Sequence, residues 1–387
     1  MLTADSLDLY DREALLGEEE RLIRDSVAKF VDREVLPIIG RCFAEHRFPA
    51  ELLPGLAELG LLGATLRGYG GAGVSNIAYG LICEELERGD SAVRSFVSVQ
   101  TSLVMSCIDS FGSEAQKERW LPPMARGEII GCFGLTEPQG GSDPANMRTS
   151  AQRSGSDWRL NGAKQWITNG GIADVAIIWA RAEEGIVAFI VETETRGFGR
   201  KTIEDKLSLR ASNTAELFLE DVALPDEARL PEAIGLKAAL TCLDRARYGI
   251  AWGALGAARA CLAEALAFTA NRTLFGRKLA ETQSIQVRLA NCARKLTVAQ
   301  LLAIRLGELK EQNAASPAQI SLAKWNNVDT ALEIARECRD MLGAAGITTE
   351  HCSMRHMLNL ETVATYEGTR TIHELVVGRL LTGHAAF

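Results

Sequence analysis

The hydrophobic pattern changes twice along this chain, and the change limits the folds available to it. Residues 1–128 and 236–387 place apolar side chains at spacings near 3.6, as helices do, whereas residues 129–235 hold short β-type runs separated by turn residues. With 387 residues the chain is also too long for one ordinary core. We therefore predict an α+β multidomain fold: an N-terminal α-helical domain, a middle antiparallel β-domain (barrel or sandwich) and a C-terminal four-helix bundle, divided at those boundaries.

Within the first domain, apolar residues recur at helical spacing over 17–35, 50–61 and 76–88. Ser75 directly precedes the third of these helices and is expected to cap it. Asp90 allows two interpretations. It could pair with Arg94 four residues on, or it could cap a further helix and leave Arg94 free to bind another group.

The middle domain predicts short strands, with a turn between two of them. The strands are expected at 131–135, 158–160, 164–168, 175–180, 186–191 and 217–219. Asn161-Gly162 lies between the second and third of these runs, and this dipeptide is a strong signal for a two-residue hairpin turn. The sequence therefore predicts a β-hairpin centred there.

The last domain predicts four long helices with short connections. They are expected at 237–271, 282–312, 316–343 and 360–381. Gly343 and Gly346 have the spacing of a helix end and its turn.

Composition excludes several function classes. The net charge of −8 disfavours nucleic acids and anionic membranes as partners, although a few local arginines could still hold a small anion. The nine cysteines have no CxxC spacing and the five histidines form no HExxH, so we expect no metal site and no disulfide framework. The acidic N-terminus lacks a leader pattern and no apolar run is long enough for a membrane span, so we expect a cytoplasmic protein.

Two glycine-rich segments suggest contrasting roles. Residues 68–73 satisfy GxGxxG, but a helix is expected before them and no βαβ rhythm surrounds them, which favours a surface turn. Residues 134–143 lead from a strand into a loop whose N–H groups could bind a flat heterocycle or a phosphate; the alternative is a plain hairpin turn. Trp166 and Thr168 could flank a ring if their strand lies beside this loop.

Two further segments carry candidate chemistry. Arg272, Phe275 and Gln283 would suit a phosphate and a planar base, or they could belong to a loop between bundle helices with Phe275 tucked into the core. Glu367 is expected at a loop–helix junction beside Gly368, where it could be a general base or a solvated loop charge.

Five segments in order resemble the acyl-CoA dehydrogenase family of flavoproteins, most closely its glutaryl-CoA dehydrogenase branch. They are residues 98–105, 131–138, 247–253, 340–343 and 365–369. The resemblance covers essentially the whole chain and implies the same helical–β–helical fold.

The resemblance implies FAD as the cofactor, bound between the β-domain and the C-terminal bundle. The residues implied to line the flavin are Phe133, Leu135, Thr136, Gly141, Ser142, Trp166, Thr168 and Thr369. Arg272, Phe275, Gln283 and the turn at Gly343 are implied to reach the FAD of a neighbouring subunit. An obligate oligomer, usually a homotetramer, follows from that sharing.

The implied reaction is α,β-dehydrogenation of an acyl-CoA thioester. Glu367 would remove the α-proton while its own N–H binds the thioester carbonyl, flavin would accept the β-hydrogen as hydride, and electrons would leave to an electron-transfer flavoprotein. Arg94 would bind a distal carboxylate, which implies a dicarboxylyl-CoA such as glutaryl-CoA, with decarboxylation. The other implied substrate residues are Glu87, Ser95, Ser98, Ser142, Leu243, Asp244, Arg247, Tyr366 and Gly368.

The chain departs from the family pattern at cofactor and substrate positions, which bears on the substrate more than on the fold. The departures are Val93, Gln139-Gly140, Asp244-Arg245, Ala344-Ala345 and Arg370-Thr371. Two alternatives therefore stay open. One is a flavin-dependent oxidase or oxygenase that uses O2 on a CoA ester in secondary metabolism, and the other is a non-catalytic acyl-CoA-binding paralogue.

Overall fold

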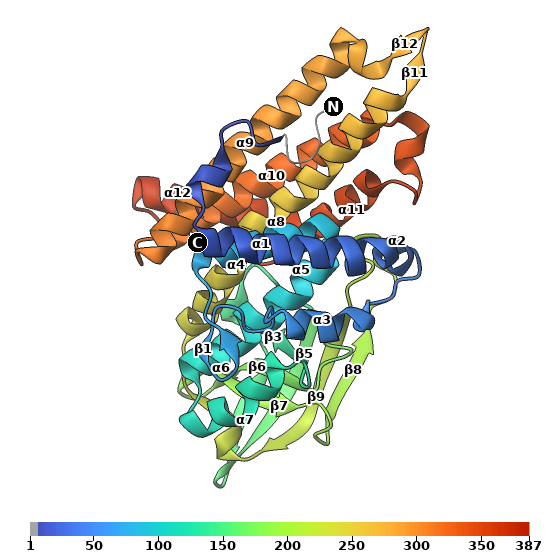
Figure 1. Ribbon diagram of the computed structural model, residues 1–387. Coiled ribbons are helices and arrows are strands. Elements are labelled where there is room, and N and C mark those ends of the chain that lie inside the picture. The colour runs from blue at the N-terminus through green and yellow to red at the C-terminus, as the bar shows by residue number, and fades with distance from the viewer. Residues whose placement is uncertain (1–6, 387) are drawn as a thin grey trace.

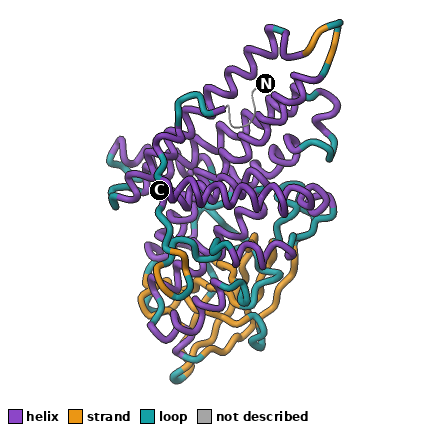
Figure 2. The backbone as a smooth tube through the Cα atoms, in the orientation of Figure 1, coloured by secondary structure: helices purple, strands orange, loops and turns teal. Residues whose placement is uncertain are grey.

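The computed structural model describes residues 7–386. The sheet of the middle domain lies at one end of the molecule beside part of the N-terminal helices, and the long C-terminal helices lie at the other end (Figures 1 and 2). The predicted helical–β–helical fold class is confirmed. The chain changes from helix to strand between α7 and β3 and back to helix between β10 and α8. The N-terminal helices are α1 (Glu18–Phe30), α2 (Leu36–Ala44), α3 (Leu53–Glu58), α4 (Asn76–Gly89), α5 (Ser91–Ser98), α6 (Ser106–Phe111) and α7 (Glu114–Ala125). The domain boundaries as numbered positions stay a prediction.

The prediction that Ser75 caps a helix is confirmed. The Ser75 side chain accepts a hydrogen bond from the Ala78 N–H, and α4 begins at the next residue.

The segment 68–73 forms a small hairpin of β1 (Arg67–Gly68) and β2 (Gly71–Ala72), which confirms the surface-turn interpretation. The two strands form an isolated antiparallel sheet, whereas a dinucleotide fingerprint requires a parallel βαβ unit.

The middle domain is one eight-stranded sheet, with strand order β10-β7-β6-β4-β5-β9-β8 and β3 paired to β6. Its strands are β3 (Gly131–Gly134), β4 (Ser150–Ser154), β5 (Asp157–Thr168), β6 (Val175–Ala182), β7 (Gly185–Glu192), β8 (Phe198–Thr202), β9 (Thr214–Leu224) and β10 (Arg229–Ile234). The predicted antiparallel sheet is wrong at two pairings, because β3 and β4 both run parallel to β6. The residue pattern of a buried strand does not encode its direction relative to its neighbours.

The predicted hairpin at Asn161-Gly162 is also wrong. Both residues lie inside the long strand β5, where the register with β9 shifts between Leu160 and Gly162. Gly162 has φ 152°, and a Cβ there would lie 2.5 Å from Thr149 Oγ1. The glycine therefore serves a β-bulge and a close approach of another strand, which are the other common reasons for glycine in a strand.

The C-terminal domain has five long helices in place of the predicted four. They are α8 (Leu236–Asn271), α9 (Gln283–Glu311), α10 (Pro317–Met341), α11 (Cys352–Thr365) and α12 (Arg370–Thr382). The predicted helix at 360–381 is broken because Glu367 and Gly368 have φ of 53° and 105°, outside helical geometry. Thr369 then caps α12 by accepting from the Ile372 N–H.

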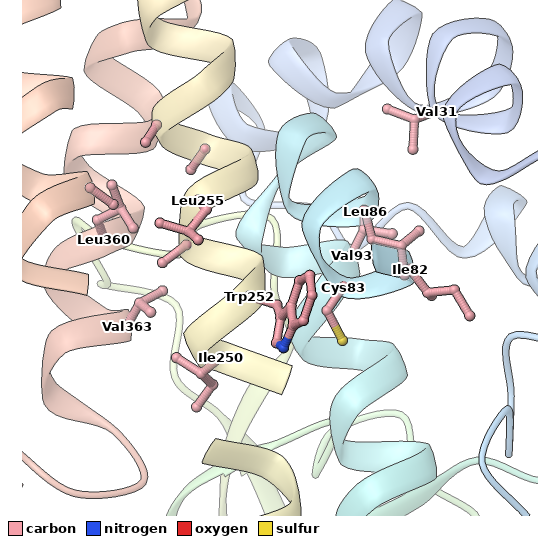
Figure 3. Packing of buried hydrophobic residues seen from close by; sticks show 14 of the residues in the cluster. Val31, Ile82, Cys83, Leu86, Val93, Ile250, Trp252, Leu255, Leu360 and Val363 are labelled. Atoms are coloured by element: carbon pink, nitrogen blue, oxygen red, sulfur yellow. The ribbon is translucent and has the colours of Figure 1, made fainter. Parts of the chain in front are cut away.

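Helix α8 is the central element of the molecule. Figure 3 shows Trp252 on the side of α8 that faces α4, whereas Ile250 and Leu255 face Leu360 and Val363 of α11. By length and composition α8 alone among the described helices could cross a membrane, but 67% of its apolar window is buried inside the protein. Core helices of soluble proteins pass the same test.

Helices α4 and α8 approach each other closely. A Cβ on Gly256 would lie only 1.8 Å from the Glu84 carbonyl oxygen of α4. The two backbones therefore come nearer than any residue with a side chain would permit. This contact holds the N-terminal domain against the C-terminal bundle.

Asp90 caps α5 and does not pair with Arg94. Its Oδ1 accepts from the Ala92 N–H over 2.8 Å, and its Oδ2 accepts from Asn359 Nδ2 over 2.9 Å and from Arg355 Nη1. Asp90 is fully buried. The carboxylate thus ties the start of α5 to α11, and the second sequence interpretation of Asp90 is confirmed.

Replacing Asp90 by Ala is expected to destabilise the protein strongly. The change leaves the buried Arg355 guanidinium without its carboxylate, and breaking a buried pair in this way costs about 3–5 kcal/mol. Thermal unfolding of the protein measures the effect. Glu45→Ala is the matched control, since it removes the exposed Arg41–Glu45 pair and should leave the midpoint unchanged. Equal midpoints for the two variants would contradict the structural role of Asp90.

Candidate active site

The turn Tyr366–Thr369, which joins α11 to α12, is held in a strained conformation by two cations. Glu367 has φ 53°, which costs a residue with a side chain of order 1–3 kcal/mol. Arg247 Nε of α8 donates to the Glu367 carbonyl over 2.7 Å. Lys324 Nζ of α10 donates to the carbonyls of Tyr366 over 3.0 Å and Gly368 over 2.7 Å. Three successive carbonyls therefore anchor this Glu367 turn.

One oxygen of the Glu367 carboxyl group is buried and unsatisfied, although the residue as a whole is half-buried. Its Oε2 has no hydrogen-bond partner anywhere in residues 7–386. Burial raises the pKa of Glu367 to about 7, although the positive charges of Arg94, Arg247 and Lys324 act to lower it. A carboxyl that changes charge near neutral pH and makes no competing hydrogen bond is suited to general-base chemistry.

Arg94 of α5 lies in the same site with one nitrogen unused. Its Nε donates to Glu87 Oε2 over 2.5 Å and its Nη2 donates to the Tyr366 hydroxyl. Its Nη1 is buried, and no described residue accepts from it. Arg94 is only 1% exposed, so water does not satisfy this donor as it would at the surface.

Three of the predicted residues, Glu87, Ser95 and Tyr366, form a hydrogen-bond network around Arg94, whereas Ser98 is not joined to it. Ser91 Oγ donates to Glu87 Oε1 over 2.8 Å, and Ser95 Oγ shares a hydrogen bond of 3.0 Å with the Tyr366 hydroxyl. Ser98 Oγ is buried and accepts or donates no hydrogen bond within the described chain. Burial raises the pKa of Tyr366 to about 12, so its hydroxyl keeps its proton at neutral pH.

The predicted residues of α8 lie beside the Glu367 turn. Arg247 Nη1 bonds Asp244 Oδ1 over 2.8 Å, so Asp244 orients the arginine that holds the turn. Leu243 is half-buried on the preceding turn of the helix. Ser142 is exposed in the loop after β3, and among the described residues no hydrogen bond or ion pair joins it to this group.

The loop 134–143 and β5 lie side by side, as the ring-binding hypothesis requires. Gln165 N donates to the Thr136 carbonyl over 2.9 Å, which places Trp166 next to the loop. Trp166 is 58% exposed with φ 62°, and Thr168 lies two residues on along the same strand. An exposed indole held in a strained conformation beside glycine-rich backbone fits a planar ligand.

A buried ion pair holds this loop against β5. Lys164 Nζ of β5 donates to Glu137 Oε1 over 2.8 Å and to the Leu135 carbonyl over 3.2 Å. Glu137 also accepts from the N–H groups of Arg148 and Thr149. Burial acts to raise the pKa of Glu137, but these hydrogen bonds hold it at about 2. The pair therefore stays charged and fixes the loop geometry.

Other predicted flavin residues vary in exposure. Phe133 and Leu135 are each 7% exposed and belong to the hydrophobic core, where Phe133 contacts Trp179. Gly141 is exposed in the loop. Thr369 is half-buried as the cap of α12. Direct contact of these residues with a flavin stays a prediction.

The segment predicted to act across a subunit interface lies far from the Glu367 turn. Arg272, Phe275 and Gln283 are exposed at the hairpin of β11 (Thr273–Leu274) and β12 (Arg277–Lys278), which projects from the far end of α8 (Figure 1). The 36 residues of α8 span about 54 Å at 1.5 Å per residue. Phe275 is fully exposed, so the alternative that it tucks into the core is wrong. Gly343 is likewise exposed, just after α10.

Sequence reasoning missed two residues of the site. Lys324 lies on the buried stripe of α10 with Ile320 and Val328, so a lysine at the i, i+4, i+8 spacing of apolar residues was the signal. His373 is fully buried in α12 under Gly368, and burial lowers the pKa of its imidazole to about 3. No pattern of spacing pointed to His373.

Metal ligands are not brought together here. Within residues 7–386, no group of three or more His, Cys, Asp or Glu side chains is placed to hold a metal ion. All nine cysteines are free, and eight of them are buried.

Comparison with known proteins agrees with this geometry. Family models for the N-terminal, middle and C-terminal domains of acyl-CoA dehydrogenases match residues 17–128, 132–222 and 234–382. A glutaryl-CoA dehydrogenase structure from Mycobacterium smegmatis aligns with a TM-score of 0.98 and 54% identity over 100% of both chains. Another from that organism, in complex with FADH2, gives 0.97 and 52%, covering 98% of this chain and 99% of that one. The mitochondrial short-chain specific acyl-CoA dehydrogenase of Bos taurus is 37% identical over 374 residues, 95% of this chain and 91% of that protein.

The fold and the buried acid–cation site thus define a flavin oxidoreductase that uses FAD. More particularly, the chain belongs to the acyl-CoA dehydrogenase family.

Reduction of bound flavin by substrate is expected to increase as pH rises through about 7, because a base must be deprotonated and Glu367 has a pKa of about 7. The variant Lys324→Met removes a positive charge that lowers this pKa, so the rising limb of kcat/KM should move to higher pH. Burial also lowers the pKa of Lys324 to about 7, so in the wild-type enzyme the limb could come from either group. The variant lacks Lys324, and a limb that remains in it at higher pH belongs to Glu367. A limb that stays in place or disappears in Lys324→Met would contradict its assignment to Glu367.

Proposed function

We propose that this enzyme oxidises a dicarboxylyl-CoA thioester such as glutaryl-CoA at the α and β carbons and then releases CO2. The observation that carries the proposal is the unused Nη1 of the buried Arg94 beside the Glu367 turn. A distal carboxylate on the acyl chain would supply the missing acceptor for Nη1. Similarity at 54% identity to a protein named glutaryl-CoA dehydrogenase supports the same substrate class.

In this proposal Glu367 removes the α-proton through Oε2, the oxygen that makes no other hydrogen bond. The backbone N–H of Glu367 donates to the thioester carbonyl, where negative charge develops as the proton leaves. The strained turn, held by Arg247 and Lys324, keeps the Glu367 N–H and Cα in a fixed place. The carboxylate is thereby presented without a search over turn conformations.

The residues that fit FAD are the loop 134–143 with Trp166 and Thr168. The chemistry that FAD supplies when bound is acceptance of a hydride from the β-carbon, which no side chain can perform. The Lys164–Glu137 pair holds the loop in the shape that this binding needs.

Decarboxylation follows from the substrate class. After oxidation the distal carboxylate is attached next to the new double bond, so loss of CO2 leaves a carbanion delocalised into the thioester. Glu367 then carries the proton it removed and is positioned to return it to the carbanion. Tyr366, which keeps its own proton, and Arg94 bind the carboxylate end until CO2 leaves.

We further propose a homotetramer in a reducing, cytoplasmic compartment and an electron-transfer flavoprotein as acceptor. The fully exposed Phe275 on a projecting hairpin supports a subunit contact, and nine free cysteines suit reducing conditions. The departure Arg370, which could have charged the flavin edge, pairs with Glu374 and Asp329. That pairing weakens the case for the oxygen-using alternative.

Glu367→Gln is expected to lower the rate of flavin reduction by glutaryl-CoA by about 10²–10⁴-fold while FAD stays bound, because the amide is no base. Anaerobic bleaching of the visible spectrum measures the rate. Glu361→Gln, an exposed change on α11, is the control and should bleach normally. Near-normal bleaching of Glu367→Gln would remove Glu367 as the base.

Admitting air to the reduced wild-type enzyme tests the electron acceptor, since rapid reoxidation would favour the oxidase.

Arg94→Met is expected to weaken glutaryl-CoA about 10–100-fold more than butyryl-CoA in kcat/KM, because only the first substrate loses a charge-assisted hydrogen bond. Arg88→Met is the control, since Arg88 bonds Asp32 and Glu85. Equal losses for the two substrates would mean that Arg94 is structural.

A further inference from the structure

Gly253 of α8 lies directly against the ion pair that positions Arg94. A Cβ at this residue would lie 2.2 Å from Glu87 Oε2 and 2.9 Å from Arg94 Nε. These are the two atoms that form the 2.5 Å hydrogen bond of the pair. A carbon atom cannot lie 2.2 Å from an oxygen to which it is not bonded. The Glu87–Arg94 pair therefore occupies the space that a side chain at residue 253 would take.

We propose that Gly253 is a specificity-determining residue, whose missing side chain sets the position of the Glu87–Arg94 pair and so directs Arg94 Nη1 to acyl-CoA substrates with a distal carboxylate. The inference rests on the proposed function and assigns to Gly253 the choice between dicarboxylyl and monocarboxylic acyl groups.

The planarity of the guanidinium carries the argument from Gly253 to Nη1. The five N–H groups of arginine lie in one plane with fixed angles. Glu87 holds Nε and the Tyr366 hydroxyl accepts from Nη2, so these two contacts fix the direction of Nη1. Any displacement at Nε therefore rotates or shifts the nitrogen that is left for substrate.

The Glu87–Arg94 pair can move in few directions. Glu87 is fully buried, and its other oxygen accepts from Ser91 Oγ over 2.8 Å. A methyl group at Gly253 consequently has to push the Glu87 carboxylate or the Arg94 side chain out of line. Both are side-chain atoms, so the helices themselves need not move apart.

The neighbouring Gly256 provides a contrast on the same helix. A Cβ there would lie 1.8 Å from the Glu84 carbonyl and 2.8 Å from Arg88 N, both backbone atoms of α4. Substitution at Gly256 therefore has to separate α4 from α8, whereas substitution at Gly253 acts on the ion pair. Two glycines on the same face thus have different functions, one in helix packing and one in specificity.

The test compares Gly253→Ala with Gly378→Ala, a helical glycine of α12 whose Cβ would meet nothing within 4 Å. The measured quantity is the ratio of kcat/KM for glutaryl-CoA to that for butyryl-CoA in the FAD-loaded enzyme. Gly253→Ala should lower the ratio at least about tenfold, mainly through KM for glutaryl-CoA, and Gly378→Ala should leave it unchanged. An unchanged ratio, or equal losses for both substrates, would overturn the proposal.

A second variant keeps the test valid if Gly253→Ala folds poorly. Glu87→Ala removes the oxygen that the new methyl group would meet, so the double variant with Gly253→Ala should retain FAD like Glu87→Ala alone. If Gly253 acts through the pair, its effect on the ratio shrinks in this background. Full additivity would overturn the proposal. A wild-type enzyme with no preference for glutaryl-CoA would instead overturn the proposed function, which makes the two failures distinguishable.

Discussion

The close approach of α8 to α4 is the constraint on which the site depends. At Gly256 the two backbones are nearer than a Cβ would allow, and this contact sets the distance between the N-terminal domain and the bundle. The same helix carries Arg247 to the Glu367 turn and gives the Glu87–Arg94 pair its space at Gly253. Arg94 of the N-terminal domain and Glu367 of the bundle are therefore brought together because α8 carries glycine at its closest contact with α4.

The chemistry near neutral pH results from two opposing electrostatic effects on one carboxyl group. Burial raises the pKa of Glu367, and the nearby positive charges of Arg94, Arg247 and Lys324 lower it, with a balance of about 7. Two of these cations, Arg247 and Lys324, also hold the turn through its carbonyls. The same groups thus serve geometry and charge, and the Glu367 carboxyl group changes its protonation state near neutral pH, as the proposed base requires.

Within one chain, the residues proposed to bind the acyl group lie together. The hairpin predicted to bind the nucleotide part of FAD lies far from them. Arg94 contacts Tyr366, the neighbour of Glu367, whereas Phe275 lies in the hairpin beyond α8, which runs about 36 Å from Arg247 at the turn to its end at Asn271. That separation is the physical reason for proposing that a neighbouring subunit contributes this hairpin. The Lys164–Glu137 pair supports the loop 134–143 within the chain, so the part of the flavin site proposed there needs no neighbouring subunit.

The sequence by itself determined the order of helical and β segments, because hydrophobic periodicity is a local property of the chain. It also determined the family, and through it the candidate residues Arg94 and Glu367. Direct local signals were sufficient for the Ser75 cap, and they left Asp90 open between two roles. Only the tertiary structure decided for the cap, since the deciding contacts come from Arg355 and Asn359, more than 260 residues away. It likewise placed Asn161-Gly162 in a strand, broke the last helix at Glu367 and put Lys324 beneath the turn, because register, backbone strain and buried pairing depend on neighbours that are distant in sequence.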